Sequence, residues 1–317
     1  MARVLVVGAG VIGLTVAARL LDDGHRVDVV ARDLPPETTS AVAAAFWYPY
    51  LAAPRDRVTA WASRSFSVLE EIAREHPGSG VRMVPGTELW RQDGGDPWWA
   101  DALPSLRRVT GVPAPYAVGL AFTAPVAEMP VYLAWLVARV EARGGTITRM
   151  ALGQLPEPGD GADVVVDASG LGARLLAGDA TVTPVRGQVV LLGQVGLDRW
   201  WLDSGTASGH SSQPTYVVPR SHDIVVGGTD EPGEWNPRPV ASTASAILDR
   251  AVRLVPALAG APVLRSRVGL RPARSVVRLE ANDGGRVIHC YGHGGAGVTL
   301  SWGCADEVAA LVAATGR

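Results

Sequence analysis

Three glycines near the start of the chain have the spacing of a phosphate-binding turn. Gly8, Gly10 and Gly13 directly follow the apolar run RVLVV and precede residues with helical spacing. In such a turn the first glycine permits a tight bend, the second lets the backbone approach a pyrophosphate, and the third lets the helix pack on the strand. This placement indicates a dinucleotide site. It would comprise Gly8, Ala9, Gly10, Val11, Ile12 and Gly13.

Two further segments could contact the rest of a dinucleotide. Arg32 and Asp33 end the second apolar run, where a carboxylate commonly binds ribose hydroxyls, although an exposed ion pair explains the same residues. Thr38, Thr39 and Ser40 offer successive hydroxyls to phosphate oxygens, and the small residues behind them would suit a planar ring. A helix N-cap accounts for this pattern equally well, so both interpretations stay open.

An arginine-rich segment could bind a carboxylate. Five arginines lie between residues 265 and 278, and Arg271, flanked by apolar residues, is the one expected to turn inward. Its planar guanidinium matches a carboxylate in a bidentate manner, and breaking such a desolvated pair costs about 2–5 kcal/mol. A surface position on an edge strand suits Arg265, Arg267 and Arg278 better.

Histidines, cysteines and glycines gather near the end of the chain. His289 and His293 are four residues apart, as in helical zinc sites, but the glycines of this segment disfavour a helix and no third ligand is evident. We therefore expect no metal, and a glycine loop that holds negative charge at a helix N-terminus. Cys290 and Cys304 form no C-x-x-C pair and are expected to be buried, inert thiols in a reducing, cytoplasmic setting.

The elements that must position these groups follow from the periodicity. A strand, a helix at Val11–Asp22 and a second strand at residues 25–33 form one βαβ unit, and residues 160–170 and 284–316 supply further strands and a C-terminal helix. A separate helix is expected at Glu128–Arg143. Strand-like runs between residues 185 and 240 indicate an antiparallel sheet. The predicted fold class is therefore α/β, a Rossmann-like domain with a second, mixed or antiparallel-sheet domain.

Length and charge limit the partners. The 317 residues exceed a typical single core and indicate two domains or one large α/β unit. The net charge of −2 gives no reason to expect nucleic acid or an anionic membrane. The apolar start is too short to span a bilayer and carries the glycine turn, so we interpret it as part of the folded protein rather than as a secretion signal.

Taken together, these segments resemble the D-amino acid oxidase family, the FAD-dependent group that includes D-aspartate oxidase. The resemblance rests on six stretches that occur in order between residues 4 and 305. They are VLVVGAGVIGL, ARDLPPETTSAVAAAFW, PVRGQ, TYVVPR, GLRPAR and HCYGHGGAGVTLSWGCA.

This resemblance implies an enzyme that oxidises neutral or basic D-amino acids to 2-oxo acids, ammonia and hydrogen peroxide. Hydride would pass from the substrate Cα to flavin N5, with oxygen as the final acceptor and no side chain acting as acid or base. The implied FAD-binding domain is discontinuous and comprises residues 1–50, 141–185 and 265–317. Residues 51–140 and 186–264 would form the substrate-binding domain, and a homodimer is compatible with the family.

The resemblance also assigns roles to residues. Thr38, Thr39 and Ser40 would contact phosphates, and Arg271 with Tyr216 would hold the substrate carboxylate, while the carbonyl of Gly295 accepts a bond from the amine. The remaining implied FAD contacts are Arg32 and Asp33 at the ribose, Ala44, Ala45 and Phe46 along one face of the isoalloxazine, and Ser169, Gly170, Gly294, Gly295, Ala296, Gly297, Val298 and Thr299.

The chain departs from the family at three positions. Ser212 and Ala296 stand where mammalian members have tyrosines, so a tyrosine-bearing lid is not expected. Asp230 stands where D-aspartate oxidases have an arginine, which disfavours an acidic substrate because two carboxylates would meet. The alternatives are a glycine- or sarcosine-type amine oxidase and a D-aspartate oxidase. A nicotinamide dehydrogenase would leave the second glycine loop unexplained.

Overall fold

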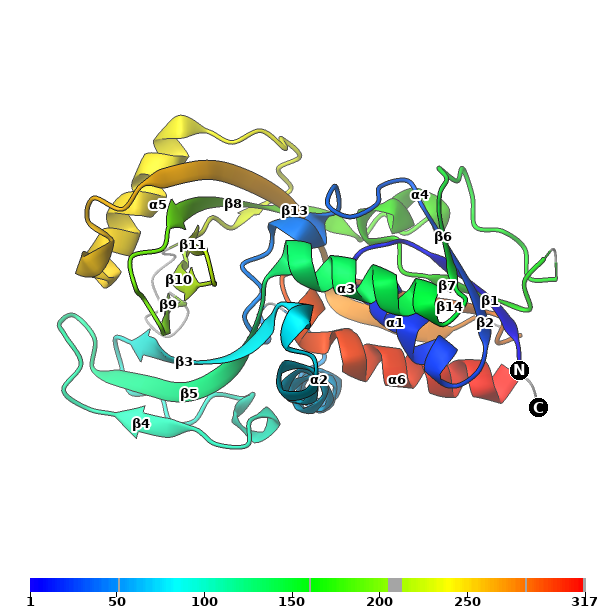
Figure 1. The fold of residues 1–317 in the computed structure, drawn as a ribbon, viewed down its shortest axis with the longest axis horizontal. Helices are drawn as coiled ribbons and strands as arrows, with labels where there is room; N and C mark the ends of the chain where they lie inside the picture. Colours follow the sequence, from blue (N-terminus) through cyan, green and yellow to red (C-terminus); the bar gives the residue numbers. More distant parts are fainter. Residues whose placement is uncertain (51, 160, 205–212, 283, 316–317) are drawn as a thin grey trace.

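The computed structural model describes residues 1–50, 52–159, 161–204, 213–282 and 284–315. Ser212 lies outside these residues. In the described part of the chain the strands form one continuous sheet, in the order β4-β5-β3-β9-β10-β11-β8-β13-β14-β7-β1-β2-β6, with β12 paired to β8 at the side. The sheet divides into a parallel part and a largely antiparallel part, which lie at opposite ends of the molecule (Figure 1).

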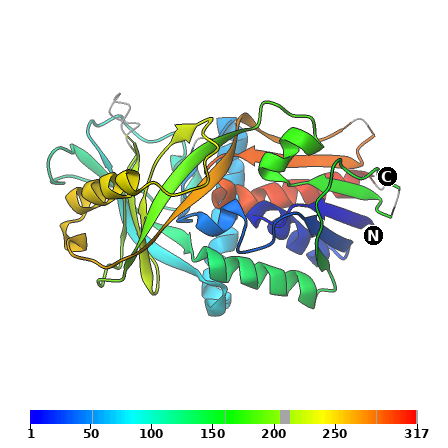
Figure 2. The ribbon, with the colours of Figure 1, turned by 90° about the horizontal axis from the view of Figure 1, so that it is seen from above.

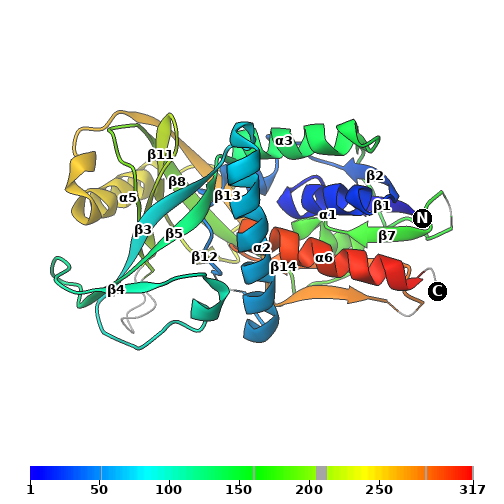
Figure 3. The same ribbon diagram turned by 60° about the horizontal axis from the view of Figure 1, so that its bottom comes forward.

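The parallel part has the order β14-β7-β1-β2-β6. Its central strands are apolar on both faces because helices and loops cover them, as parallel sheets require. Helices α1, α3 and α6 lie side by side over one face (Figure 3). The bounds are β1 (Arg3–Val7), α1 (Val11–Asp22), β2 (Arg26–Ala31), α3 (Met129–Ala142), β6 (Thr146–Arg149), β7 (Val164–Asp167), β14 (Val287–His293) and α6 (Gly297–Thr315).

The second part is antiparallel except for the parallel pair β3 and β9. Helix α5 (Ala241–Leu254) packs on β8, β10 and β11 and encloses a small separate core. The strands are β3 (Val81–Trp90), β4 (Arg107–Val109), β5 (Val118–Ala127), β8 (Thr183–Gly193), β9 (Trp200–Asp203), β10 (Thr215–Pro219), β11 (Asp223–Gly227), β12 (Glu231–Pro232) and β13 (Val263–Ala281).

Strand β13 joins the two parts. It pairs with β8 from Val263 to Ala273 and with β14 from Ala273 to Ala281, so one strand belongs to both (Figure 2). Short helical segments complete the described structure. They are η1 (Thr39–Val42), η2 (Pro77–Ser79), η3 (Ala100–Ala102), η4 (Gly170–Gly172), α4 (Ala173–Leu176) and η6 (Pro256–Leu258).

The predicted fold class is confirmed, and α1 has the predicted bounds. Two helices from residues 51–142 contact helices of the parallel part. Helix α2 (Arg55–Glu75) packs on α6, where a Cβ at Gly303 would lie 2.4 Å from the backbone of Trp61, and α3 packs on α1. Helix α3 therefore covers the parallel part, whereas α2 lies between the two parts and also contacts β3 and β5 (Figure 3).

Within the described residues, no helix combines the length and the apolar character that crossing a membrane requires.

Candidate active site

A cavity of about 840 Å³ runs between the two parts of the sheet. One end is the turn after β1, at the carboxyl ends of the parallel strands, where open α/β sheets bind their ligands. The other end reaches Arg271 on β13 and Tyr216 on β10. Residues of the predicted nucleotide turn and of the predicted carboxylate clamp therefore line the same cavity.

The glycine turn is built from backbone alone. Gly8 has φ +123°, and a Cβ there would lie 2.3 Å from the carbonyl oxygen of Ala168, so only glycine fits. Helix α1 begins after Gly10, whose cap position has no side-chain hydrogen bond. The positive end of α1 thus faces the cavity, as an anion site requires, and Ser40 is a side chain that reaches its first N–H. Gly13 does not line the cavity. A Cβ there would lie 1.9 Å from the oxygen of Gly8, which makes Gly13 a packing residue.

The three predicted hydroxyls have three different surroundings. Ser40 Oγ accepts a bond from the Val11 N–H at 3.0 Å, and Thr39 Oγ1 donates to the carbonyl of Leu270 at 3.1 Å. Thr38 occupies the cap position of η1 without making a cap bond, and its buried hydroxyl has no partner among the described residues. A buried hydroxyl without a partner beside a helix N-terminus fits a bound phosphate group.

Arg32 and Asp33 line the cavity and also pair with each other. The Arg32 Nη2 to Asp33 Oδ2 distance is 2.6 Å, and the arginine side chain is 77% exposed. The structure fits both interpretations, a ribose contact and an exposed ion pair, because an exposed ion pair next to a cavity can still hydrogen-bond to a ribose.

Ala44, Ala45, Phe46 and Tyr48 form part of the cavity wall. Ala45 is the only non-glycine residue with positive φ (+56°) in the described chain, a conformation that costs an L-residue about 1 kcal/mol. It is held by a bond from the Ala127 N–H to its carbonyl at 2.8 Å. Phe46 packs its ring against Trp200, with centroids 5.5 Å apart. Backbone strain at a cavity wall is typical of a ligand clamp.

Arg271 lies over a glycine. A Cβ at Gly187 on β8 would lie 2.3 Å from Arg271 Nη2, so the bare backbone makes room for the flat guanidinium. Nη1 donates to the carbonyl of Thr229 at 3.0 Å and faces Asp230 Oδ1 at 3.4 Å. Asp230 therefore points toward the clamp.

Tyr216 and Gly295 flank Arg271. The ring of Tyr216 covers Gly227, where a Cβ would lie 2.2 Å from the ring. Burial raises the pKa of Tyr216, an effect that the positive charge of Arg271 partly offsets, so the phenol remains a hydrogen-bond donor. A Cβ at Gly295 would meet Tyr50 at 2.8 Å and the Arg271 side chain at 3.5 Å.

Two tyrosines at this end were missed from the sequence. Tyr50 donates to Asp230 Oδ2 at 2.9 Å, and burial followed by the Asp230 charge raises its pKa. Tyr48 donates to the fully buried Glu88 at 2.9 Å, and both tyrosines line the cavity. The segment YPY carries no periodic or motif signal, and only its aromatic density hints at a site.

The structure brings most predicted site residues to one cavity. Besides Gly13, Ala296 is absent from the lining and fully buried. The predicted residues that line it are Gly8, Ala9, Gly10, Val11, Ile12, Arg32, Asp33, Thr38, Thr39, Ser40, Ala44, Ala45, Phe46, Ser169, Gly170, Tyr216, Arg271, Gly294, Gly295, Gly297, Val298 and Thr299.

A parallel sheet with a glycine turn, joined through one cavity to an antiparallel sheet with an inward arginine, defines a dinucleotide-binding oxidoreductase fold. The family model described as FAD dependent oxidoreductase matches residues 3–311. The chain belongs to this family and uses FAD. The glycine turn, the N-terminus of α1 and the unpartnered Thr38 hydroxyl fit this cofactor.

Relatives and solved structures agree with this assignment. The chain is 50% identical to a protein named D-amino-acid oxidase from Rubrobacter xylanophilus, covering 99% of this chain and 96% of that one. It is 44% identical to a D-amino-acid oxidase from Streptomyces coelicolor, over 98% and 96% of the two chains. The crystal structure of glycine oxidase from Bacillus cereus superimposes with a TM-score of 0.80 at 19% identity, covering 100% and 96%, which shows a shared fold.

Proposed function

We propose that the protein is a D-amino-acid oxidase that converts neutral or basic D-amino acids to 2-oxo acids, ammonia and hydrogen peroxide. The observation that carries the proposal is the position of Arg271. Its guanidinium lies over Gly187, beside Tyr216 and Gly295, at the end of the cavity opposite the glycine turn. The 50% identity to a D-amino-acid oxidase supports the same assignment.

In this proposal the parallel part of the sheet holds FAD and the antiparallel part covers the substrate. When bound, FAD supplies the group that accepts hydride and returns electrons to oxygen. The chain's own residues then only bind and orient the substrate. Arg271, Tyr216 and Gly295, which lie together at one end of the cavity, would carry out this binding.

Arg271 would bind the α-carboxylate through its planar guanidinium, and the Tyr216 hydroxyl would donate to the same group. The Gly295 carbonyl would accept a hydrogen bond from the α-amine. With carboxylate and amine fixed at two points, only one enantiomer directs its Cα–H bond toward the wall formed by residues 44–46. Selectivity for the D form would therefore follow from positioning.

Asp230 sets the charge around the substrate. Its carboxylate is 3.4 Å from Arg271 and accepts a bond from Tyr50, so it offsets part of the positive charge of the clamp. A substrate with an acidic side chain would place a second carboxylate near it, at a Coulomb cost. Neutral and basic side chains avoid this cost, which favours them over D-aspartate.

The test is a peroxide-release assay of the FAD-loaded enzyme across both enantiomers of many amino acids, with glycine, sarcosine and D-aspartate in the same panel. Peroxide from neutral or basic D-amino acids, and little from the L forms, is the expected result. A preference for glycine or sarcosine would point to a glycine-type oxidase instead. Absence of turnover with every D-amino acid, despite bound FAD, would refute the proposal.

A further inference from the structure

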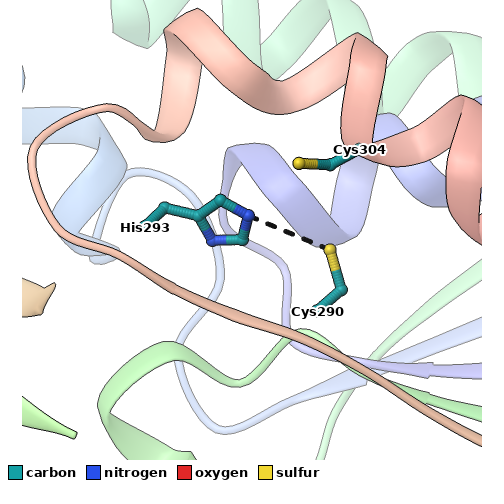
Figure 4. Close-up of side chains that lie close together, drawn as sticks. All are labelled: Cys290, His293 and Cys304. Carbon is teal, nitrogen blue, oxygen red and sulfur yellow. Dashed lines mark hydrogen bonds between the residues drawn. The ribbon is translucent and has the colours of Figure 1, made fainter. Parts of the chain in front are cut away.

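Two cysteines and a histidine meet in the core behind the cavity. Cys290 comes from the middle of β14, His293 from its last residue, and Cys304 from α6 (Figure 4). Their three possible ligand atoms all lie within 4.8 Å of one another, and the Cys290 Sγ to His293 Nε2 distance is 4.0 Å. All three residues are buried. The two cysteines, 14 positions apart in sequence, therefore belong to one compact cluster.

The histidine pair that the sequence suggested is divided in the structure. His289 lies outside the cluster, and its Nδ1 is 3.4 Å from Asp167 Oδ2. Two thiols take the place of the second histidine, because Cys290 and Cys304 lie beside His293. The two thiols are buried, as expected, and both lie beside the same histidine.

Two sulfurs and an imidazole nitrogen select the class of metal. Calcium and magnesium prefer oxygen ligands, which this cluster does not offer. Zinc takes thiolates at about 2.3 Å and imidazole at about 2.0–2.1 Å, so ligand atoms around a tetrahedral ion lie about 3.5–3.8 Å apart. Two thiolates and a neutral imidazole would also balance the charge of a divalent ion, which matters in a buried place.

We propose that Cys290, His293 and Cys304 bind one zinc ion. The site needs its ligand atoms to contract by about 1 Å or less from their present spacing. Three protein ligands leave the fourth tetrahedral position for a water. Because Cys290 and His293 also line the large cavity, that position has a polar space to face.

The ion would fasten the glycine loop to the helix behind it. The His293 carbonyl accepts a bond from the Ala296 N–H at 3.0 Å, and the Gly294 N–H donates to Pro272 at 2.8 Å, so His293 opens the loop that lines the cavity. Cys304 lies on α6, which starts where the loop ends. A metal bound by both would hold the loop and α6 together, without taking part in substrate oxidation.

The experiment uses tag-free holoenzyme that has been reduced with a phosphine and treated with a chelator. Cobalt(II) is titrated first, because tetrahedral cobalt with thiolate ligands gives intense d–d bands to the red of the flavin absorption. We expect these bands to saturate at one equivalent and to disappear when one equivalent of zinc is added. Bound zinc should also raise the Tm of the holoenzyme, since it binds the folded state.

Variants assign the ligands. Cys290→Ser and Cys304→Ser should each lose the one-equivalent binding and the tetrahedral bands, while His289→Gln, the matched buried histidine outside the cluster, should keep both. Flavin absorbance and circular dichroism report whether each variant is folded. The proposal is overturned if the wild-type holoenzyme shows no tetrahedral cobalt spectrum, or if the two serine variants bind zinc as tightly as the wild type. Reduced wild-type protein tests the idea even if a variant fails to fold.

Discussion

The two ends of the cavity are built in different ways. The cofactor end is made of backbone and small residues, with Gly8 and Gly10 in one continuous turn and Ala44 and Ala45 in another. The substrate end is made of side chains that are far apart in sequence, as in the contact between Tyr50 and Asp230, 180 residues apart. A local motif therefore encodes the first end, whereas only the folded sheet assembles the second.

The largest expected effect separates the two ends. Arg271→Ala should lower kcat/KM for a D-amino acid by about 30- to 5,000-fold, mainly through KM, because truncating one partner of a desolvated charge pair costs about 2–5 kcal/mol. FAD should stay bound. Steady-state kinetics and the flavin spectrum check this, and Arg265→Ala, an exposed arginine on the same strand, is the control. Equal losses in both variants would contradict the clamp.

A change at the other end should act on the cofactor instead. Gly8→Ala would place a Cβ 2.3 Å from the Ala168 carbonyl oxygen at φ +123°, at a cost of at least about 2 kcal/mol in strain and overlap. We expect weaker FAD binding and a lower free energy of unfolding, measured by flavin titration and urea denaturation. Gly153→Ala, where a Cβ would meet nothing within 4 Å, should change stability by no more than about 0.5 kcal/mol.

A substitution of Asp230 tests whether the charge at the substrate end determines which side chains the enzyme prefers. Asp230→Asn should raise kcat/KM for D-aspartate relative to D-alanine on the order of tenfold, since like charges within about 10 Å repel by about 1.5 kcal/mol at an effective dielectric constant near 20. The amide oxygen can still accept from Tyr50. Asp249→Asn, an exposed aspartate on α5, changes the net charge equally and should leave the ratio unaltered. An unchanged ratio in both variants would exclude Asp230 as a specificity residue.

The smallest effect concerns the buried carboxyl behind Tyr48. Burial raises the pKa of Glu88 above its usual 4.5, and hydrogen bonds from Ser204, Trp90 and Tyr48 only partly offset this. The unfolded chain therefore releases this proton first, so wild-type stability should decline as pH rises above about 4.5 and level off beyond the folded-state pKa. Glu88→Gln should remove that decline. Parallel pH profiles of the two proteins in urea denaturation would argue against a raised pKa.

Local patterns predicted the parallel part well. Helix α1 begins and ends at the predicted residues, and the helix expected at Glu128–Arg143 is α3, flanked by these two residues as caps. Apolar periodicity, glycine spacing and helix length are all properties of neighbouring residues. The structure that these properties predict is found in the folded protein because it depends only on residues that are close together in the chain.

The sequence could not predict groups that only tertiary structure brings together. Tyr50 lies in an aperiodic segment, and its partner Asp230 follows a strand much later in the chain. Cys304 is a helix residue that faces a strand end, a direction that spacing does not reveal. Sequence order also does not reveal that α2 contacts α6 of the parallel part as well as β3 and β5 of the antiparallel part.

The shared strand β13 has a mechanical consequence. Arg271 pairs with Val185 of β8, Pro272 bonds to Gly294, and Ala273 already pairs with His293 of β14. The two parts of the sheet cannot separate by a hinge motion without breaking the hydrogen bonds that β13 makes to β8 and β14. The distance between Arg271 and the glycine loop that begins at Gly294 is therefore fixed. Ligands must enter and leave through small local displacements rather than by opening the whole molecule.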